Sequence, residues 1–279
     1  MENKFSFSGD LNEKAYLLGL RTGDVHARRH YRLIQADTTS PKSAQLDMFT
    51  RAFSKYSNVK SYKKKGGYTA TTNRIYCLLD SSFSFLIEKP KVIPMWIVKN
   101  DQLFYSFLAG YADSEGSWII TQHRKYNGKW KDLVFSLGTC DKKILIQIQE
   151  KLKKLGFNSH FYLVRKKGIY DSRICNFDLY RIMIMNHKDV VRLAEILLPL
   201  SLHGDKKNMQ SKIIEYNKIN IGQKALKKQN LGTININCPV CNNKKVWKNG
   251  FSRYMNKKYP RYKCPGCKKE FEGVNLCQK

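Results

Sequence analysis

Two ten-residue stretches that share one pattern of glycine and acidic residues constrain this chain more than any other feature. They lie at 16–25 and 107–116. When they are aligned, Gly19 falls on Gly110, a small residue follows four positions later in each, and acids stand at 24 and 115. Small residues four apart share one face of a helix and allow two helix backbones to approach closely. The pattern predicts two helices packed along these faces, with their last turns bringing two carboxylates together.

These stretches carry a resemblance to a known family. The second, LAGYADSEG at 108–116, resembles the LAGLIDADG motif of homing endonucleases, and LLGLRTGDV at 17–25 resembles a degenerate first copy. The first copy departs from the pattern at Arg21, Thr22 and Val25. Order and spacing support it, because the two acids are 91 residues apart (115 − 24), about one small αβ repeat. The alternative is a pair of ordinary amphipathic helices that contain glycine.

The hydrophobic and turn patterns predict an α+β chain with an internal repeat. Each half is predicted as helix, strand, strand, helix, strand, strand, helix. Among these elements are a strand at 26–37, a helix at 44–56, a helix at 142–155 and a strand at 172–185, with a turn at 165–168. The predicted domains are a first repeat at 1–96, a second at 97–220, a basic linker at 221–237 and a zinc ribbon at 238–279. The resemblance implies that the two sheets form a concave, DNA-binding saddle with the motif helices at its centre.

The net charge predicts a polyanionic partner. The chain has 279 residues, with 51 Lys and Arg against 22 Asp and Glu, for a formal net charge of +29. Nucleic acid is the first candidate for such an excess. A membrane surface is the competitor, but no apolar run approaches the ~18 residues of a spanning helix. Since the first residues also lack a signal-peptide pattern, an intracellular protein without a membrane partner is expected.

Four of the eight cysteines predict a metal site. They form two CxxC pairs with 22 residues between them, at Cys238, Cys241, Cys264 and Cys267. Four thiolates at this spacing can close around one Zn²⁺ as a tetrahedron. The alternatives are unrelated thiols or a redox dithiol. The unit resembles the zinc ribbons found beside DNA-binding domains, and it is small enough that the metal is expected to supply much of its folding free energy.

The paired acids Asp24 and Glu115 predict a site for Mg²⁺ or another divalent cation. Hydrolysis of a phosphodiester needs an activated water and a stabilised leaving oxygen, and hard cations held by carboxylates supply both. The alternative is two solvated carboxylates at helix ends. An acid at a helix C-terminus opposes the helix dipole at a cost of about 0.3–1 kcal/mol, so its occurrence twice at matching positions favours the metal site. Asp113 is expected to face away from Glu115.

Further catalytic candidates come from the resemblance alone. The family often places a glutamine on the strand after each motif helix, which points to Gln35 and Gln122. It also places a basic group near the site, which points to Lys206 or Lys207 as a residue that polarises bound water. The alternatives are base-reading or surface glutamines and a solvated basic loop.

The predicted DNA contacts come from basic residues of the strands and their turns. Alternate residues of the strands would face DNA, although a charged run is more often simply a solvated face. The candidates are Arg28, Arg29, Arg32, His123, Arg124, Lys125, Arg165 and Lys166.

The predicted function is site-specific, metal-dependent cleavage of both strands of DNA by a monomer. The resemblance implies a homing endonuclease, typically intron-encoded, that makes staggered cuts. The alternative is a protein of the same fold that binds without cutting, such as an intron-RNA maturase or a DNA-binding regulator. Retention of both acids favours the nuclease. The sequence leaves open the target site, the host element and whether intron RNA is also bound.

Overall fold

The computed structural model describes residues 5–65, 71–122, 131–170, 173–230, 236–254 and 257–272. The chain divides into two compact units, Met1–Ile219 and Asn220–Lys279. Within the described ranges, no helix is both long enough and apolar enough to cross a membrane.

The first repeat alternates helices with pairs of antiparallel strands. Its elements are α1 (Leu11–Thr22), β1 (His26–His30), β2 (Leu33–Ser40), α2 (Ser43–Phe53), β3 (Lys60–Lys65), β4 (Thr71–Leu79) and the 3-10 helix η1 (Ser81–Leu86). Asp10 caps α1 by accepting a hydrogen bond from the backbone amide of Glu13 at 2.8 Å. Asp80 caps η1 in the same way, through the amide of Ser82 at 2.9 Å.

The second repeat has the same order with one extra hairpin. The short α3 (Met95–Val98), into which the predicted domain boundary falls, leads to the repeat. The repeat comprises α4 (Asp101–Glu115), β5 (Gly116–Gln122), β6 (Lys131–Thr139), α5 (Lys142–Lys154), β7 (Ser159–Arg165), β8 (Gly168–Tyr170), β9 (Arg173–Cys175), β10 (Leu179–Ile184) and α6 (His187–Leu197). The long helix α7 (Gly204–Asn230) follows.

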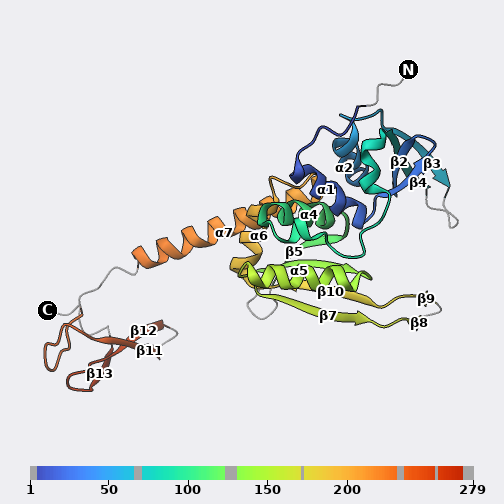
Figure 1. Cartoon of the computed structure of the whole chain (residues 1–279). Helices are drawn as coiled ribbons and strands as arrows, with labels where there is room; N and C mark the ends of the chain where they lie inside the picture. Colours follow the sequence, from blue (N-terminus) through green and yellow to red (C-terminus); the bar gives the residue numbers. More distant parts are fainter. Residues whose placement is uncertain are drawn as a thin grey trace. The chain divides into compact units, whose positions relative to one another are not determined.

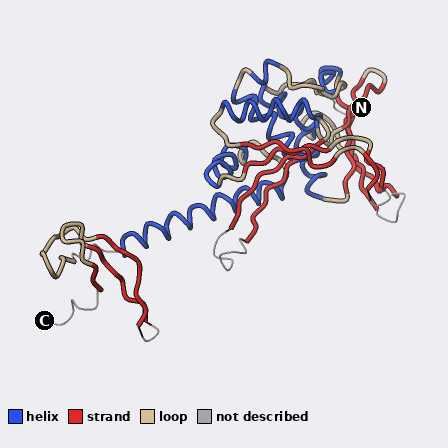
Figure 2. Tube along the Cα trace, turned by 90° about the horizontal axis from the view of Figure 1, so that it is seen from below, coloured by secondary structure: helices blue, strands red, loops and turns tan. Residues whose placement is uncertain are grey.

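The two main sheets have the same strand order, which confirms the internal repeat. They run β1-β2-β4-β3 and β5-β6-β10-β7. All neighbouring strands in both sheets are antiparallel. In the Met1–Ile219 unit most of the helices lie on one side of the strands (Figure 2). The predicted mixed helix and antiparallel sheet fold is therefore confirmed.

One face of each sheet is apolar and packs against the helices. Ile34 on β2 pairs with Leu79 on β4, and Leu137 on β6 pairs with Ile182 on β10, and all four are buried. Side chains alternate along a strand, so the intervening residues point to the opposite side, here called the open face. On the first sheet the open face includes Arg28, Gln35, Asp37, Tyr62, Arg74 and Tyr76. On the second it includes Ser117, Ile119, Val134, His160, Tyr162 and Arg181.

The motif helices α1 and α4 pack backbone to backbone. A methyl group built on Gly19 would lie 2.2 Å from the carbonyl oxygen of Phe107, and one on Gly110 would lie 2.1 Å from that of Tyr16. The contacts are reciprocal, because Phe107 stands 91 residues after Tyr16, as Gly110 does after Gly19. The close packing predicted from the glycine spacing is therefore confirmed.

Substituting either motif glycine by alanine is expected to destabilise the Met1–Ile219 unit. In Gly110→Ala the new methyl meets backbone atoms of α1, so the two helices must separate. Overpacking of this kind costs about 1–3 kcal/mol, which for a unit of this size lowers the melting temperature by several degrees. Thermal unfolding followed by circular dichroism measures the change. Gly204→Ala is the control, since nothing lies within 4 Å of its added methyl. Equal melting temperatures for the two variants would contradict the packing argument.

The stretch 26–37, predicted as a single strand, is a hairpin of β1 and β2. The chain reverses at Tyr31 and Arg32, and Tyr31 has a φ of 54°. Glycine, asparagine or aspartate usually occupies such a left-handed position. None is present here, so the sequence gives no turn signal at this point.

The turn predicted at 165–168 is also wrong. Instead of reversing there, the chain continues from β7 into β8, and the reversal follows Tyr170, which pairs with Arg173 on β9. The result is a two-stranded arm beyond the second sheet, labelled β8 and β9 in Figure 1. The dipeptides Gly66-Gly67 and Asn127-Gly128, which predict hairpin turns from the sequence, lie outside the described residues.

The predicted linker at 221–237 is helical as far as Asn230, where α7 ends. Gly222 does not end the helix, and the lysine, glutamine, alanine and leucine that follow it favour helix. The Asn220–Lys279 unit then forms a three-stranded antiparallel sheet, β11-β12-β13. Its strands are β11 (Trp247–Tyr254), β12 (Lys257–Lys263) and β13 (Glu270–Glu272).

Candidate active site and metal centre

The C-terminal ends of α1 and α4 meet at one cavity. Asp24 follows the capping residue of α1, and Glu115 is the last residue of α4. A methyl group built on Gly23 would lie 2.2 Å from Cβ of Ser114 and 3.4 Å from Cγ of Glu115, so the two helix ends are in contact. Both acids line a cavity of about 570 Å³. The structure therefore brings together the two carboxylates that the motif spacing pairs.

The environment of Glu115 disfavours its negative charge. Burial raises the pKa of Glu115, and the nearby charge of Asp24 raises it further. The ammonium groups of Lys206 and Lys89 act in the opposite direction. Two carboxylates held this close repel each other unless a cation or a proton lies between them. The cavity therefore has the electrostatic character of a cation site.

Lys206 is anchored to the end of α4. Its ammonium donates hydrogen bonds to the carbonyl oxygens of Ala112 at 2.7 Å and Ser114 at 2.9 Å, and also to that of Asp113. Burial lowers the pKa of Lys206 to about 8, against the charges of the nearby acids. An ammonium group has three hydrogens, and all three have carbonyl partners. Lys206 therefore fixes the end of α4 and places its charge beside the cavity.

Gln45 is the glutamine that contacts a motif acid. Its Nε2 donates to Oδ2 of Asp24 at 3.2 Å, and it lines the cavity. The sequence reading missed it. The signal was available, because Gln45 stands in the buried stripe of α2 together with Met48, Phe49 and Ala52. A polar residue in an apolar helical stripe usually has a partner that its burial requires.

Asp113, which was expected to face away from Glu115, is buried and is absent from the lining of the cavity that contains Glu115. Its Oδ2 accepts hydrogen bonds from the Tyr16 hydroxyl at 2.6 Å and from the backbone amides of Leu202 at 2.6 Å and His203 at 3.2 Å. It thus ties α4 to α1 and to the segment before α7. His203 itself is buried and lines the cavity, where burial lowers its pKa.

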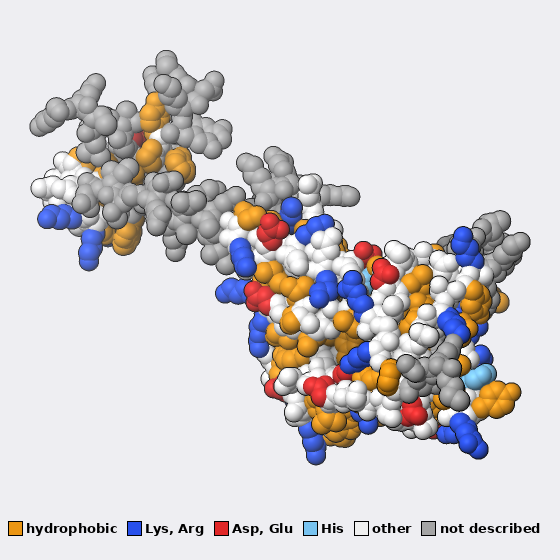
Figure 3. All heavy atoms as spheres, turned by 90° about the horizontal axis from the view of Figure 1, so that it is seen from above, with side chains coloured by type: hydrophobic (Ala, Val, Ile, Leu, Met, Phe, Trp, Pro, Cys, Tyr) orange, Lys and Arg blue, Asp and Glu red, His pale blue; other side chains and the backbone are white. Residues whose placement is uncertain are grey.

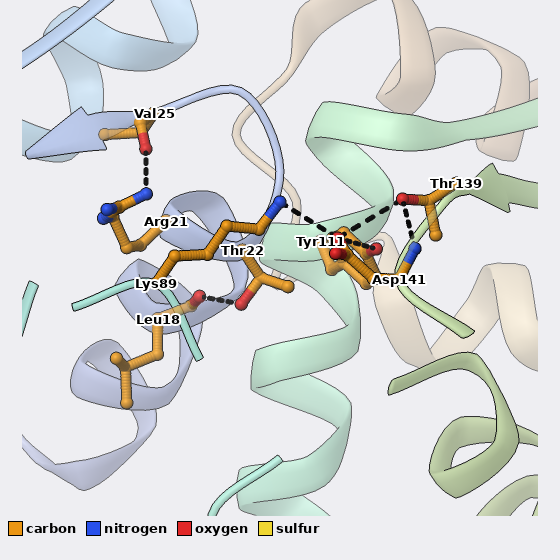
Figure 4. A network of polar contacts seen from close by, with 8 residues as sticks. All are labelled: Leu18, Arg21, Thr22, Val25, Lys89, Tyr111, Thr139 and Asp141. Atoms are coloured by element: carbon orange, nitrogen blue, oxygen red, sulfur yellow. Dashed lines mark hydrogen bonds and ion pairs between the residues drawn. The ribbon is translucent and has the colours of Figure 1, made fainter. Parts of the chain in front are cut away.

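A further acid, Asp141, lies beside Glu115 and was also missed. It precedes α5, and its Oδ2 accepts hydrogen bonds from Thr139 at 3.3 Å and Tyr111 at 3.4 Å. The ammonium of Lys89 lies 3.0 Å from the same oxygen (Figure 4). Burial raises the pKa of Tyr111, so the hydroxyl remains a hydrogen-bond donor. This network places the negative charge of Asp141 and the positive charge of Lys89 near Glu115.

Arg21, which departs from the motif, has a structural role. Its guanidinium donates to the carbonyl oxygens of Leu86 at 2.6 Å, Ile87 at 3.0 Å and Val25 at 3.3 Å. Figure 4 shows the bond to Val25. Burial lowers the pKa of Arg21. The side chain joins the end of α1 to the end of η1, which explains how this position tolerates a charge.

Gln35 lies in a different network, on the open face of the first sheet. Arg28 donates to Oε1 of Gln35 at 3.2 Å, and Nε2 of Gln35 donates to Asp37 at 3.3 Å. Arg74 forms an ion pair with Asp37 and donates to the Tyr62 hydroxyl at 3.3 Å. The chain of contacts crosses all four strands. Gln35 is not among the residues that line the cavity, and neither is Gln122, the last residue of β5.

The predicted DNA contacts are not all on one face. Arg28 lies on the open face, whereas Arg29 pairs with Ile34 and lies on the other side of the sheet. Arg32 is in the hairpin turn, and exposed Arg165 ends β7 with its guanidinium 5.6 Å from the ring centre of Tyr170. Exposed Lys166 follows it. His123, Arg124 and Lys125 lie outside the described residues. On the face drawn in Figure 3 the Lys and Arg side chains are spread widely rather than gathered in one patch.

The four predicted cysteines form one cluster in the Asn220–Lys279 unit. The Sγ atoms of Cys238, Cys241, Cys264 and Cys267 all lie within 4.8 Å of one another. The separation is 3.5 Å between Cys238 and Cys267 and 3.4 Å between Cys241 and Cys264. Four tetrahedral bonds of ~2.3 Å to zinc separate the sulfurs by about 3.8 Å. Small movements of the four Sγ atoms are therefore enough for them to coordinate the ion.

The two CxxC pairs sit in turns of the same kind. The residue after each pair has a left-handed backbone, with φ of 56° at Asn242 and 58° at Lys268. The amide of Cys238 donates to the carbonyl of Asn243, and that of Cys264 donates to the carbonyl of Lys269, both at 3.0 Å. Repeated turns that direct two sulfurs each toward one point are typical of a zinc ribbon, and the cluster fits a metal ion.

Removing the charge of Lys206 is expected to make cation binding more sensitive to acid. In Lys206→Met the pKa of Glu115 rises further, because an ammonium that lowers it is lost. A divalent cation binds the ionised carboxylate, so affinity falls as the pH drops through the raised pKa, and the variant loses affinity at a higher pH than the wild type. Titration with Mn²⁺ between about pH 5 and 8 measures the shift. Lys207→Met removes the same charge one residue later and serves as the control. If Mn²⁺ binding by the wild type and by Lys206→Met had the same pH midpoint, the charge of Lys206 would have no effect on the ionisation of Glu115.

In a comparison with known families, the second repeat matches one family model. Residues 105–197 match the sequence model of the LAGLIDADG-like domain. A search of curated proteins found no match to the sequence.

Solved structures of LAGLIDADG proteins resemble the chain. The homing endonuclease I-WcaI, bound to its DNA recognition sequence, has 19% identity and a TM-score of 0.46, over 69% of this chain and 81% of its own. A mesophilic variant of the homing endonuclease I-DmoI has 16% identity and a TM-score of 0.43, over 67% and 90%. The N-terminal LAGLIDADG domain of DUF199/WhiA has 18% identity and a TM-score of 0.42, over 68% and 84%.

The family match covers most of α4, including all of the second motif, and continues through α6. The resemblance read from that motif is therefore confirmed, and this chain contains a LAGLIDADG-like domain.

Proposed function

We propose that this chain is a metal-dependent endonuclease that hydrolyses phosphodiester bonds of double-stranded DNA. The observation that carries the proposal is the meeting of Asp24 and Glu115, one from each repeat, in a single cavity. The net charge of +29 favours a polyanionic substrate, and the LAGLIDADG-like domain supports the reaction class.

Asp24 and Glu115 would hold Mg²⁺ or another divalent cation. The residues fit such an ion, since they offer carboxylate oxygens that repel each other without a cation, and Mg²⁺ needs few protein ligands. When bound, the ion lowers the pKa of its water and stabilises the leaving oxygen. Gln45 orients the carboxylate of Asp24 through its 3.2 Å hydrogen bond, and Lys206 holds the backbone that carries Glu115. We therefore assign Gln45 rather than Gln35 to the first motif acid.

The reaction is proposed to be site-specific and to give staggered cuts. One chain supplies both acids, so it would act as a monomer, with one acid serving each DNA strand. The open faces of the two sheets would contact the target, where the network that links Arg28, Gln35, Asp37 and Arg74 fixes the direction of its donors and acceptors. The four-cysteine cluster would hold a structural Zn²⁺ in the second unit.

The test uses the full chain and a plasmid library that carries randomised target sites. The library is incubated with Mg²⁺, and cut ends are captured by adaptor ligation and sequenced. The expected result is linear plasmid with paired, staggered ends at one sequence, and no product when the metal is chelated. A protein that shifts plasmid in a gel but releases no cut ends with either Mg²⁺ or Mn²⁺ would instead be the alternative, an intron-RNA maturase or a DNA-binding regulator.

A further inference from the structure

We propose that one face of the sheet β11-β12-β13 binds unpaired nucleobases of a single-stranded polynucleotide by stacking. This surface, here called the aromatic face, consists of Lys248, Phe251, Pro260, Tyr262 and Phe271. It belongs to the Asn220–Lys279 unit, whereas the acids of the proposed nuclease site belong to the other unit. The inference therefore does not depend on cleavage at that cavity.

The strand register places these residues on the same side of the sheet. Lys248 pairs with Tyr262, Tyr262 pairs with Phe271, and Phe251 pairs with Pro260. Residues directly opposite on antiparallel strands share a face, and so do residues two apart on one strand. A bulge between Lys248 and Phe251 sets three residue steps of β11 against two of β12. This irregularity brings Phe251 to the side that holds Lys248.

The aromatic face offers flat rings with a cation beside them. Phe251 is 56% exposed, and the Lys248 ammonium lies 4.7 Å from its ring centre. The rings of Tyr262 and Phe271 stack with their centres 5.8 Å apart and their planes at 26°. A strip of rings that ends in an exposed phenylalanine is the form of a base-stacking surface.

Packing within the unit does not account for the exposed ring. The buried apolar residues of the unit are Ile236, Cys238 and Cys264, as far as the structure describes it, and none of them belongs to this face. No helix of the 236–254 and 257–272 segments covers the sheet either. The exposed side of the Phe251 ring is therefore available to a ligand, next to the other two rings and the lysine of the aromatic face.

The distribution of charge identifies the ligand as a polyanion. From residue 238 to 279 there are eleven Lys and Arg against two acids, Glu270 and Glu272. Both acids lie on the opposite face, because Glu270 pairs with Lys263 and Glu272 pairs with Arg261. Glu270 is also in ion pairs with both of those basic residues. Among the described residues, the aromatic face therefore carries a lysine and no acid.

A ring and a cation together favour unpaired bases over a duplex. In a duplex the flat faces of the bases are covered by their neighbours, so an aromatic side chain has no base face to stack on. In a single strand the bases are free, and each stacked base contributes about 1–3 kcal/mol. Single-stranded DNA and RNA share this chemistry.

The experiment measures binding of the full chain to short fluorescent oligonucleotides. The probes are oligo-dU, oligo-U and an abasic strand of the same length, which keeps the phosphates and lacks the bases. Excess unlabelled duplex is present throughout to occupy duplex-binding surfaces. The wild type is expected to bind oligo-dU or oligo-U at least about fivefold more tightly than the abasic strand.

Phe251→Ala is expected to weaken binding to the base-containing strand by about 5- to 150-fold, and Phe251→Trp is expected to retain it. The matched control is Trp247→Ala. Trp247 lies on the same strand and is 64% exposed, but it pairs with Lys263 and so lies on the opposite face. Zinc content is measured for each variant to establish that the unit is folded, and Lys248→Ala is a second variant that spares the rings.

The possible results are distinct. Loss in Phe251→Ala with retention in Trp247→Ala supports the inference, and the tighter of oligo-dU and oligo-U identifies DNA or RNA as the natural ligand. Equal affinity for the abasic strand, displacement by duplex, unchanged binding in Phe251→Ala, or an equal loss in Trp247→Ala would each overturn it. Plasmid cleavage is scored separately, so a chain without nuclease activity leaves this test unaffected.

Discussion

Glu115→Gln is expected to slow double-strand cleavage by about 10²–10⁴-fold, the largest effect of any single substitution proposed for this chain. The amide keeps the size of the side chain but removes the charge that holds a divalent cation. Loss of a metal ligand removes several kcal/mol of transition-state stabilisation, and each 1.36 kcal/mol is about tenfold in rate. Asp24→Asn is expected to act in the same way. Linearisation of the target plasmid under single-turnover conditions measures both rates.

Binding separates a catalytic role for these acids from a structural one. Removal of a carboxylate near phosphates lowers repulsion, so both variants are expected to bind target DNA at least as tightly as the wild type in Ca²⁺. Asp47→Asn makes the same chemical change at an exposed position on α2 and serves as the control. Wild-type cutting rates in both Asp24→Asn and Glu115→Gln would show that the acids do not hold the catalytic ion.

Removal of zinc is expected to unfold the Asn220–Lys279 unit while leaving the Met1–Ile219 unit folded. The small unit has few buried apolar residues in its described part, namely Ile236, Cys238 and Cys264. A structural zinc ion supplies about 10–16 kcal/mol in units of this kind, more than such a core provides. Cys264→Ser, or chelation of the wild type, is therefore expected to abolish the dispersed amide resonances of β11, β12 and β13 in an NMR spectrum.

Metal analysis is the direct check on that prediction. One zinc per chain is expected in the reduced wild type and none in Cys264→Ser. Cys140→Ser is the control, because Cys140 is an exposed thiol of the other unit and is outside the cluster. A reduced, folded sample without zinc would rule out a structural role for the metal.

The parts of the site that sequence predicts are those fixed by local geometry. Which helix face Gly19 and Gly110 occupy relative to the acids that follow them depends only on the period of a helix. The structure has the predicted close contact between α1 and α4 at these glycines. The CxxC pairs likewise bring two sulfurs together within one turn. Strands joined by a short connection, such as β3 and β4, pair with each other, so the alternation of helices and strand pairs could be read from the pattern as well.

The residues that sequence missed reach the site through tertiary packing. Gln45 contacts Asp24 because α2 packs across the first sheet, and Asp141 lies near Glu115 because α5 begins there. The apolar stripe of α2 indicates that Gln45 has a buried partner, but no local pattern identifies that partner as Asp24, and the resemblance pointed to Gln35 instead. Lys206 was identified as a basic group, but its role in holding the end of α4 depends on coordinates.

The reciprocal contact of α1 with α4 has the form of the interface in a two-fold symmetric homodimer. Gly19 meets Phe107 and Tyr111 while Gly110 meets Tyr16 and Leu20, so each partner presents the same patch to the other. Because one chain carries both patches, the two positions outside the contact need not match. Arg21 therefore stands where the other patch has Ala112, and the shared seam is kept.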